Sequence, residues 1–224
     1  MRPIGEVAFI PADIPETVFL GNAGECFDRR KIDFEVCLFG FRFEEFDGKP
    51  CRPKEAKIIT VFGSSKVTPE KKEYQAAVEL GRLLAAEGYT VCTGGYRGIM
   101  EAACKGAKEA GGKTLAITTS QFKGTVNAWI DEEKSFPNWN ERLFGLIEAA
   151  DAYVVCDGGT GTLVELLSVW EMSNQKILNK PVVIYGKTMQ QILTQIKAVP
   201  EIIFNPCLRF SDTAQDVVNA LRGN

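Results

Sequence analysis

Short apolar runs alternate with amphipathic stretches along the chain from Lys57 onward. The apolar runs predict buried strands, and the stretches with apolar residues every three or four positions predict helices. The predicted strands are 58–62, 89–93, 114–118, 152–156, 181–185 and 207–210. The predicted helices are 69–87, 99–110, 139–150, 161–171, 188–198 and 212–221.

Residues at the ends of these segments support the assignment. The first helix has a capping residue before Pro69 at its first position, and Gly88 ends it. Asn138 and Glu141 have the spacing of a capping box, and Ser211 is expected to cap the last helix. These signals predict helix boundaries independently of the apolar pattern.

Strands that alternate with helices predict a doubly wound, Rossmann-like α/β fold, in which helices cover both faces of a parallel sheet. Right-handed crossovers favour a strand order of 3-2-1-4-5. The first and fourth strands are then neighbours at the switch point, where a crevice opens at the carboxyl ends. Glycine-containing turns follow the first, second and fourth strands, at 63–65, 94–98 and 158–162, so all three meet at one edge. Residues 119–139 are predicted to form a long polar loop, which in a compact domain is usually functional or mobile.

The turn at 158–162 has the geometry of an anion site. The first turn of a helix has unpaired N–H groups and the positive end of the dipole, and glycines let a phosphate approach the backbone. Thr160 and Thr162 add hydroxyl donors, and Glu165 lies on the same side of the helix. Because anion binding needs no carboxylate, Glu165 is a candidate for chemistry. The alternatives are an ordinary strand-to-helix turn and a solvated glutamate. The apolar face of this helix is predicted to comprise Leu163, Leu166, Leu167 and Trp170.

Residues 1–56 differ from the rest of the chain. Apolar and polar residues alternate from Ile32 to Leu38, which predicts a strand, and Phe41 and Phe43 continue the pattern in the opposite phase after Gly40. We therefore predict two parts, a β-rich N-terminal extension at 1–56 and a nucleotide-binding domain at 57–224.

Composition excludes several classes of protein. The net charge of −3 and the pI near 5.3 argue against a nucleic-acid binder, and no apolar run is long enough to span a membrane. The N-terminus lacks a signal-peptide pattern. The seven cysteines contain no C-x-x-C pair, which favours reduced thiols in a cytoplasmic protein, with Cys92, Cys104 and Cys156 in the core.

The chain has no histidine, which excludes Ser-His-Asp and Cys-His catalysis and every His-ligated metal site. Neither the dinucleotide fingerprint nor a Walker motif is present. No metal and no cofactor are predicted. The three glycine turns at the switch point predict a nucleotide-type site, whose ligand is a phosphorylated small molecule.

Three motifs together resemble the LOG-type family of Rossmann-like proteins, often mislabelled lysine decarboxylases. They are VFGSS at 61–65, GGYRGIMEAA at 94–103 and GGTGTLVE at 158–165. The resemblance covers about 57–198 and implies a nucleoside 5′-monophosphate phosphoribohydrolase, which cleaves the N-glycosidic bond to give a free base and ribose 5-phosphate. The wider superfamily also holds nucleotide-sensing and molybdenum-cofactor-carrying proteins, so the alternative is a non-catalytic binder or carrier.

The resemblance also assigns roles. Glu165 and Arg142 would be catalytic, and Arg142 could instead be a surface residue paired with Glu141 or Glu148. Leu143 stands where the family has a lysine, and Asp157 replaces a proline beside the phosphate cradle. The expected binding residues are Gly63, Ser64, Ser65, Gly94, Gly95, Arg97, Gly98, Met100, Gly158, Gly159, Thr160, Gly161 and Thr162.

A homodimer is expected from the same resemblance, because the family's two helices around the site lie near a two-fold interface. Phe144, Ile147, Trp170 and Met172 supply apolar surface for such an interface.

Overall fold

The computed structural model describes residues 17–20, 25–28 and 57–222, and the chain divides into two compact units, Met1–Glu55 and Ala56–Asn224. In the first unit, β1 (Thr17–Leu20) pairs antiparallel with β2 (Glu25–Asp28). The strand predicted at 32–38 lies outside the described residues. The assignment of 1–56 as an appendage to a nucleotide-binding domain stays a prediction.

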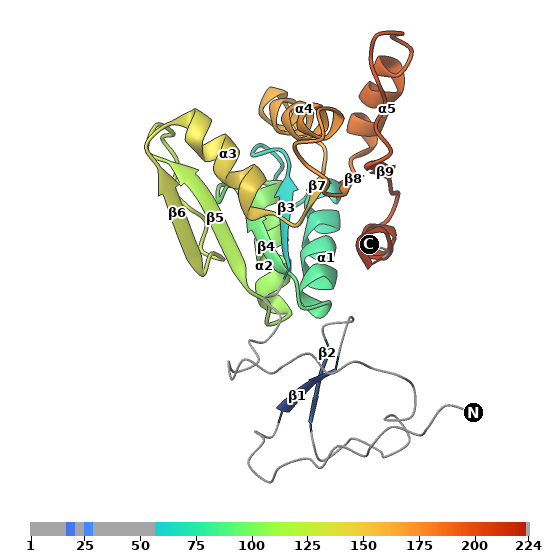
Figure 1. The fold of residues 1–224 in the computed structure, drawn as a ribbon. Helices are drawn as coiled ribbons and strands as arrows, with labels where there is room; N and C mark the ends of the chain where they lie inside the picture. Colours follow the sequence, from blue (N-terminus) through green and yellow to red (C-terminus); the bar gives the residue numbers. More distant parts are fainter. Residues whose placement is uncertain (1–16, 21–24, 29–56, 223–224) are drawn as a thin grey trace, which may run out of the picture. The chain divides into compact units, whose positions relative to one another are not determined.

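The second unit contains a parallel sheet whose described part has seven strands in the order β6-β5-β4-β3-β7-β8-β9 (Figure 1). The predicted Rossmann-like fold and the order of the first five predicted strands are confirmed, with β9 added beyond β8. The strands are β3 (Ile58–Phe62), β4 (Thr90–Thr93), β5 (Thr114–Thr119), β6 (Glu132–Phe136), β7 (Ala152–Val155), β8 (Val182–Ile184) and β9 (Leu208–Phe210).

Helices cover both faces of the sheet, and each face has its own apolar core. One core contains residues of α1, α2 and α6, and the other contains residues of α3, α4 and α5. In the described ranges, none of these helices is long and apolar enough to cross a membrane. The helices are α1 (Lys72–Ala86), α2 (Ile99–Glu109), α3 (Trp139–Ala149), α4 (Thr160–Asn174), α5 (Lys187–Ile196) and α6 (Ala214–Arg222).

The long loop predicted at 119–139 is wrong in its second half, because residues 132–136 form β6. This strand has the sequence EEKSF and its first four residues are exposed. Among the described strands it lies at the sheet edge and pairs only with β5, so it needs no buried face and carries no apolar alternation.

Two helix starts also differ from the prediction. Helix α1 begins at Lys72, three residues after Pro69, because Lys71 N–H donates to the Thr68 carbonyl and closes a separate turn. Helix α6 is capped by Thr213, whose Oγ1 accepts from the backbone N–H of Asp216 at 3.1 Å. Ser211, the predicted cap, instead donates its backbone N–H to β8, at Ile184 O.

Two helix ends also differ from the prediction, because α4 continues to Asn174 and α5 ends at Ile196, whereas the boundaries of α2 and α3 agree to within one residue. Asn138 Oδ1 accepts from the Glu141 N–H at 2.9 Å, so this capping interaction is confirmed. Gly88, with φ +78, lies directly after the Glu87 cap of α1.

Helix α4 buries a different face from the one predicted. Leu166 and Trp170 are buried as expected, but Leu167 is 45% exposed. The buried stripe is completed by small and polar residues that the apolar pattern does not show, Thr162, Val169 and Ser173. Val164 and Leu167 are exposed instead, and they form a second apolar face that points away from the sheet.

Helices α1 and α2 pack so closely that their backbones meet at glycine. A Cβ added at Gly106 would lie 1.8 Å from the carbonyl oxygen of Val78. A side chain there would push α2 away from α1 and open the core on that face.

We therefore predict that Gly106→Ala lowers the free energy of unfolding by about 1–3 kcal/mol, the usual effect of overpacking. Gly161→Ala is the matched control, because Gly161 is also helical and an added Cβ there meets nothing within 4 Å. Denaturant midpoints of the two variants give the comparison. Equal midpoints would show that the close approach of α1 and α2 does not constrain stability.

Candidate functional site

Backbone hydrogen bonds join the three glycine turns at the carboxyl edge of the sheet. Ser64 N–H donates to Asp157 O at 3.0 Å, and Ile99 N–H donates to Ser64 O at 2.8 Å. The residue after β3 thus contacts both the turn after β7 and the start of α2. The three motifs singled out in the sequence are therefore adjacent in the structure.

The first turn of α4 faces open space. Gly159, Thr160 and Gly161 are exposed, and no side chain of the described residues caps the helix. A Cβ added at Gly159 would meet nothing within 4 Å, and its φ of −95° is open to any residue. The fold therefore does not require glycine at this position, and the free space beside the N–H groups is available to an anion.

Thr162 supports this turn from inside. Its side chain is buried, and its Oγ1 lies 2.1 Å from where a Cβ of Gly158 would be. Of the two threonines predicted as donors, only Thr160 is exposed.

Asp157 is turned toward a neighbouring helix. Its Oδ1 accepts from the backbone N–H of Met189 at 2.9 Å, in the first turn of α5. The N-cap of α5 is Gly186, which has no side chain that could accept from the first N–H groups of the helix. The carboxylate thus stabilises the positive end of α5, which gives the residue a structural role beside the cradle.

Arg142 and Glu165 form a buried ion pair between α3 and α4. Arg142 Nη1 lies 2.9 Å from Glu165 Oε1, and the two side chains are 6% and 12% exposed. Arg142 Nε also donates to Ile117 O of β5 at 3.1 Å. The alternative of an exposed pair with Glu141 or Glu148 is wrong.

Gly94 makes room for this pair. A Cβ at Gly94 would lie 2.0 Å from Arg142 Nη2 and 3.0 Å from Met100 Sδ. Because Gly94 has no side chain, the Arg142 side chain can extend from α3 past the end of β4, and its guanidinium can lie against the backbone there and reach Glu165. The motif residue predicted to bind ligand has a second role in placing Arg142.

Burial raises the pKa of Glu165 above its usual value, and the guanidinium of Arg142 opposes this shift. The Glu165 carboxylate is thus poorly hydrated, and the guanidinium of Arg142 balances its negative charge at Oε1. Such a group stabilises positive charge that develops nearby more strongly than it would in water.

The remaining predicted residues surround this centre. Gly95, Gly98 and Met100 are buried in the turn and first residues after β4, Gly63 and Ser64 are half-buried, and Ser65 and Arg97 are exposed. Leu143, in the place of the family's lysine, is 6% exposed and belongs to the apolar core under α3 and α4.

Sequence reasoning missed an aromatic pair beside the ion pair. The Phe122 ring centroid lies 5.8 Å from the guanidinium carbon of Arg142 and 5.9 Å from the ring centroid of Tyr96. The available signal was an aromatic residue in a long polar loop, next to a motif that carries a second aromatic residue.

The cysteines of this region are unsuited to nucleophilic chemistry. Burial raises the pKa of each of Cys92, Cys104 and Cys156 to about 12, so they are thiols at neutral pH. Their predicted place in the core is confirmed.

Comparison with known proteins agrees with the three motifs. The model of the SLOG cluster4 family matches residues 56–205. The chain belongs to this family. A protein of Archaeoglobus fulgidus is 30% identical over 154 residues, 68% of this chain and 95% of that protein. The cytokinin riboside 5′-monophosphate phosphoribohydrolase LOG3 of Arabidopsis thaliana is 29% identical over 189 residues, 79% of this chain and 87% of LOG3.

A solved structure has the same fold. The molybdenum cofactor binding protein of Rippkaea orientalis superposes with a TM-score of 0.63 at 26% identity, over 76% of this chain and 98% of that one.

Rice relatives, named as probable cytokinin riboside 5′-monophosphate phosphoribohydrolases, match over 52% to 63% of their own length. The chain is thus similar to proteins whose names describe catalysis, and it shares its fold with a cofactor binder.

The ion pair makes a prediction about stability. Arg142→Met leaves a buried carboxylate without its partner and should destabilise the protein by about 3–5 kcal/mol at neutral pH. Adding Glu165→Leu should recover most of this loss, as a double-mutant cycle in urea would show.

The pH dependence has a definite sign. Without Arg142 the pKa of Glu165 rises further above its unfolded value, so folding favours the protonated carboxyl. The deficit of Arg142→Met should therefore be largest at neutral pH and shrink as the pH falls. A deficit independent of pH, or additive losses in the cycle, would argue against a coupled buried pair.

Proposed function

We propose that this protein hydrolyses the N-glycosidic bond of a nucleoside 5′-monophosphate, giving a free base and ribose 5-phosphate. The observation that carries the proposal is a buried, charge-balanced Glu165 one turn beyond an open helix N-terminus. The phosphoribohydrolase named above, at 29% identity, supports the same reaction.

Each part of the site has a role in the proposed reaction. The first N–H groups of α4, with Thr160, would bind the 5′-phosphate. The carboxylate of Glu165 would stabilise the positive charge that develops on the ribose as the bond to the base breaks. Water adds its oxygen to the ribose C1′ and gives up a proton to Glu165. The base leaves with the electron pair and takes a proton from solvent, while Arg142 orients the carboxylate.

A second candidate function is binding or carriage of a phosphorylated cofactor. The Rippkaea orientalis protein, whose name describes binding of the molybdenum cofactor, has the same fold at 26% identity. Leu143 also favours this reading, because the Arg-Lys pair that the family resemblance implies for catalysis is incomplete. The same cradle would hold the phosphate group of such a cofactor.

Glu165→Gln separates the two functions. Gln keeps the volume and an oxygen that can accept from Arg142, and it removes the charge, so turnover per folded molecule should fall by a few hundredfold, for a preorganised charge worth about 3–4 kcal/mol. Nucleotide binding should be retained or stronger, since a negative charge near the phosphate is removed. The measurement is release of free base from a panel of nucleoside monophosphates, with calorimetry for binding.

Gly159→Val is the complementary variant. The side chain would enter the open space beside the cradle and abolish phosphate binding, with an unchanged denaturation midpoint.

Turnover by Glu165→Gln at the original rate would exclude the proposed mechanism. Binding without turnover in every version, the original protein included, would favour the carrier.

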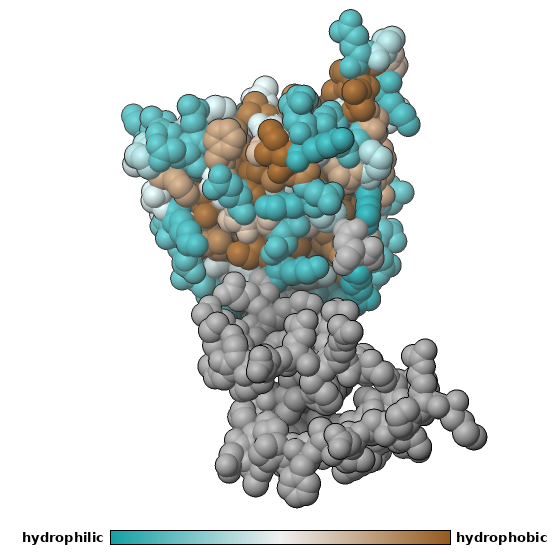
Figure 2. Space-filling model, viewed as in Figure 1, coloured by the Kyte–Doolittle hydropathy of each residue, from teal (hydrophilic) through white to brown (hydrophobic). Residues whose placement is uncertain are grey.

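We also propose a homodimer that buries the outer apolar face of α3 and α4. Apolar surface lies over this part of the molecule (Figure 2), and each helix carries an exposed apolar residue, Phe144 of α3 at 48% and Leu167 of α4 at 45% exposure. Ile147 and Trp170, expected to contribute, are buried in the core instead. A patch of this kind on a helix pair fits a self-complementary interface.

Leu167→Glu should convert the dimer to a monomer, measured by light scattering after gel filtration. The matched control is Ile177→Glu, which changes a residue of 66% exposure just beyond α4. A monomeric original protein, or a dimer insensitive to Leu167→Glu, would refute this interface.

A further inference from the structure

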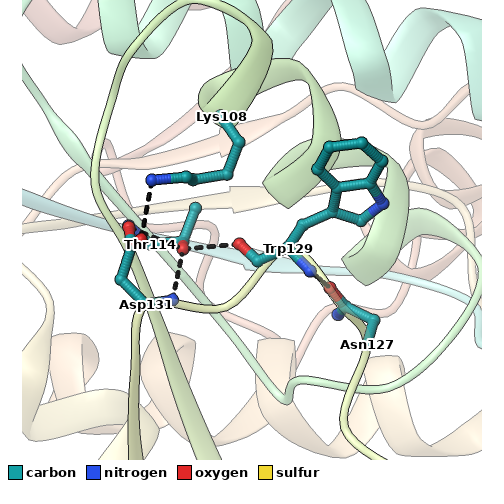
Figure 3. A network of polar contacts seen from close by, with 5 residues as sticks. All are labelled: Lys108, Thr114, Asn127, Trp129 and Asp131. Carbon is teal, nitrogen blue, oxygen red and sulfur yellow. Dashed lines mark hydrogen bonds and ion pairs between the residues drawn. The ribbon is translucent and has the colours of Figure 1, made fainter.

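The segment between β5 and β6 is fixed at its far end by a polar network (Figure 3). Thr114 Oγ1 donates to Trp129 O at 2.7 Å, and Asp131 Oδ2 accepts from Thr114 N–H at 2.9 Å. Lys108 of α2 pairs with Asp131 at 2.6 Å, and this pairing lowers the pKa of the Asp131 carboxyl. The segment is thereby held where it enters β6.

The middle of the segment is bonded to the turn after β4. Asn127 Nδ2 donates to the carbonyls of Gly95 and Tyr96 at 2.9 and 3.0 Å, and Asn127 N–H donates to Gly95 O at 2.8 Å. Asn127 Oδ1 accepts from Trp129 N–H and so connects this anchor to the network. One asparagine therefore joins the segment to the glycine motif.

These anchors hold two aromatic rings at the rim of the site. Tyr96 and Phe122 lie with their planes at 54°, and Phe122 is 41% exposed beside the buried guanidinium of Arg142. A Cβ at Gly124 would lie 2.7 Å from the Tyr96 ring, so the ring packs directly on the segment's backbone. Because the rings are tilted, a planar group between them could stack on the face of one ring and make an edge-to-face contact with the other.

The sheet order places this pair apart from the cradle. Along the carboxyl edge, Phe122 follows β5, Tyr96 follows β4, Ser64 follows β3 and the cradle follows β7. The Arg142–Glu165 pair spans this interval, since Arg142 contacts β5 and the Phe122 ring and Glu165 belongs to the helix after β7. A ligand with its phosphate at α4 and its sugar at Glu165 would extend toward the two rings.

We infer that Tyr96 and Phe122 form the binding site for the base of the nucleotide, and that Phe122 is a specificity-determining residue. This inference rests on the proposed function and adds the part of the ligand that the phosphate cradle does not recognise. Stacking accepts any planar base, so the rings select a nucleotide over a base-free sugar phosphate. The exposed ring face is the surface left for that contact.

The test compares adenosine 5′-monophosphate with ribose 5-phosphate, which lacks the base. A stacked base contributes about 1–3 kcal/mol, or roughly 5- to 150-fold in affinity. Phe122→Leu should weaken adenosine 5′-monophosphate binding by about tenfold within that range and leave ribose 5-phosphate binding unchanged. Phe122→Tyr keeps the ring and should restore nucleotide affinity.

Phe210→Leu is the matched control. Phe210 is 47% exposed, and its ring stacks on Phe204 with centroids 6.1 Å apart, away from the turns of the site. It should bind both ligands as the original protein does.

The possible results separate the two proposals. Equal weakening of both ligands by Phe122→Leu would mean that the ring acts only by positioning Arg142, and no weakening would mean that the base lies elsewhere. Either result overturns the base site while the proposed hydrolysis stands. A protein that binds neither ligand and releases no base would overturn the proposed function and the base site together.

Discussion

The buried pair of Arg142 and Glu165 constrains most of the site around it. Removing two charges from water costs several kcal/mol for each ion, and the attraction between them offsets this only with good geometry and further hydrogen bonds. Arg142 meets these conditions through Ile117 O, the Phe122 ring and Glu165. Each partner comes from a different element, so the pair fixes α3, β5 and α4 relative to one another.

The same requirement explains local features that otherwise look unrelated. Gly94 lacks a side chain where Arg142 passes the end of β4. Leu143, the next residue on α3, points into the core, which orients the helix so that Arg142 faces Glu165. Because exchange of either charged partner would leave the other buried alone, the arrangement has little tolerance for change.

The sequence predicted what depends on local pattern and failed where tertiary contacts decide. Apolar runs such as 152–156 are buried on both faces, so their strands and the parallel order followed from composition and crossover rules. β6 was missed because an edge strand exposed to solvent has no apolar signature. The start of α1 was misplaced because a turn at Thr68–Lys71 uses the same capping residues.

The candidate site shows the same division. The glycine turns were found from their spacing, since a strand, a turn and a helix are consecutive in the chain. The pairing of Arg142 with Glu165 joins residues 23 apart, and the bond from Asp157 to Met189 joins residues 32 apart. No periodicity connects such positions. Asp157 stood out only as a replacement for proline beside the cradle, because its partner on α5 was invisible in the sequence.

The pair also bears on whether the protein catalyses or carries. A carrier gains nothing from a carboxylate beside an anion site, since the charge repels the phosphate and its burial is unfavourable. A hydrolase needs that charge, because the transition state is more positive than the bound nucleotide. Holding Glu165 against Arg142 limits the repulsion in the ground state while leaving one carboxylate oxygen outside the pair. In the proposed reaction this arrangement would serve differential stabilisation of a transition state, which binding alone does not need.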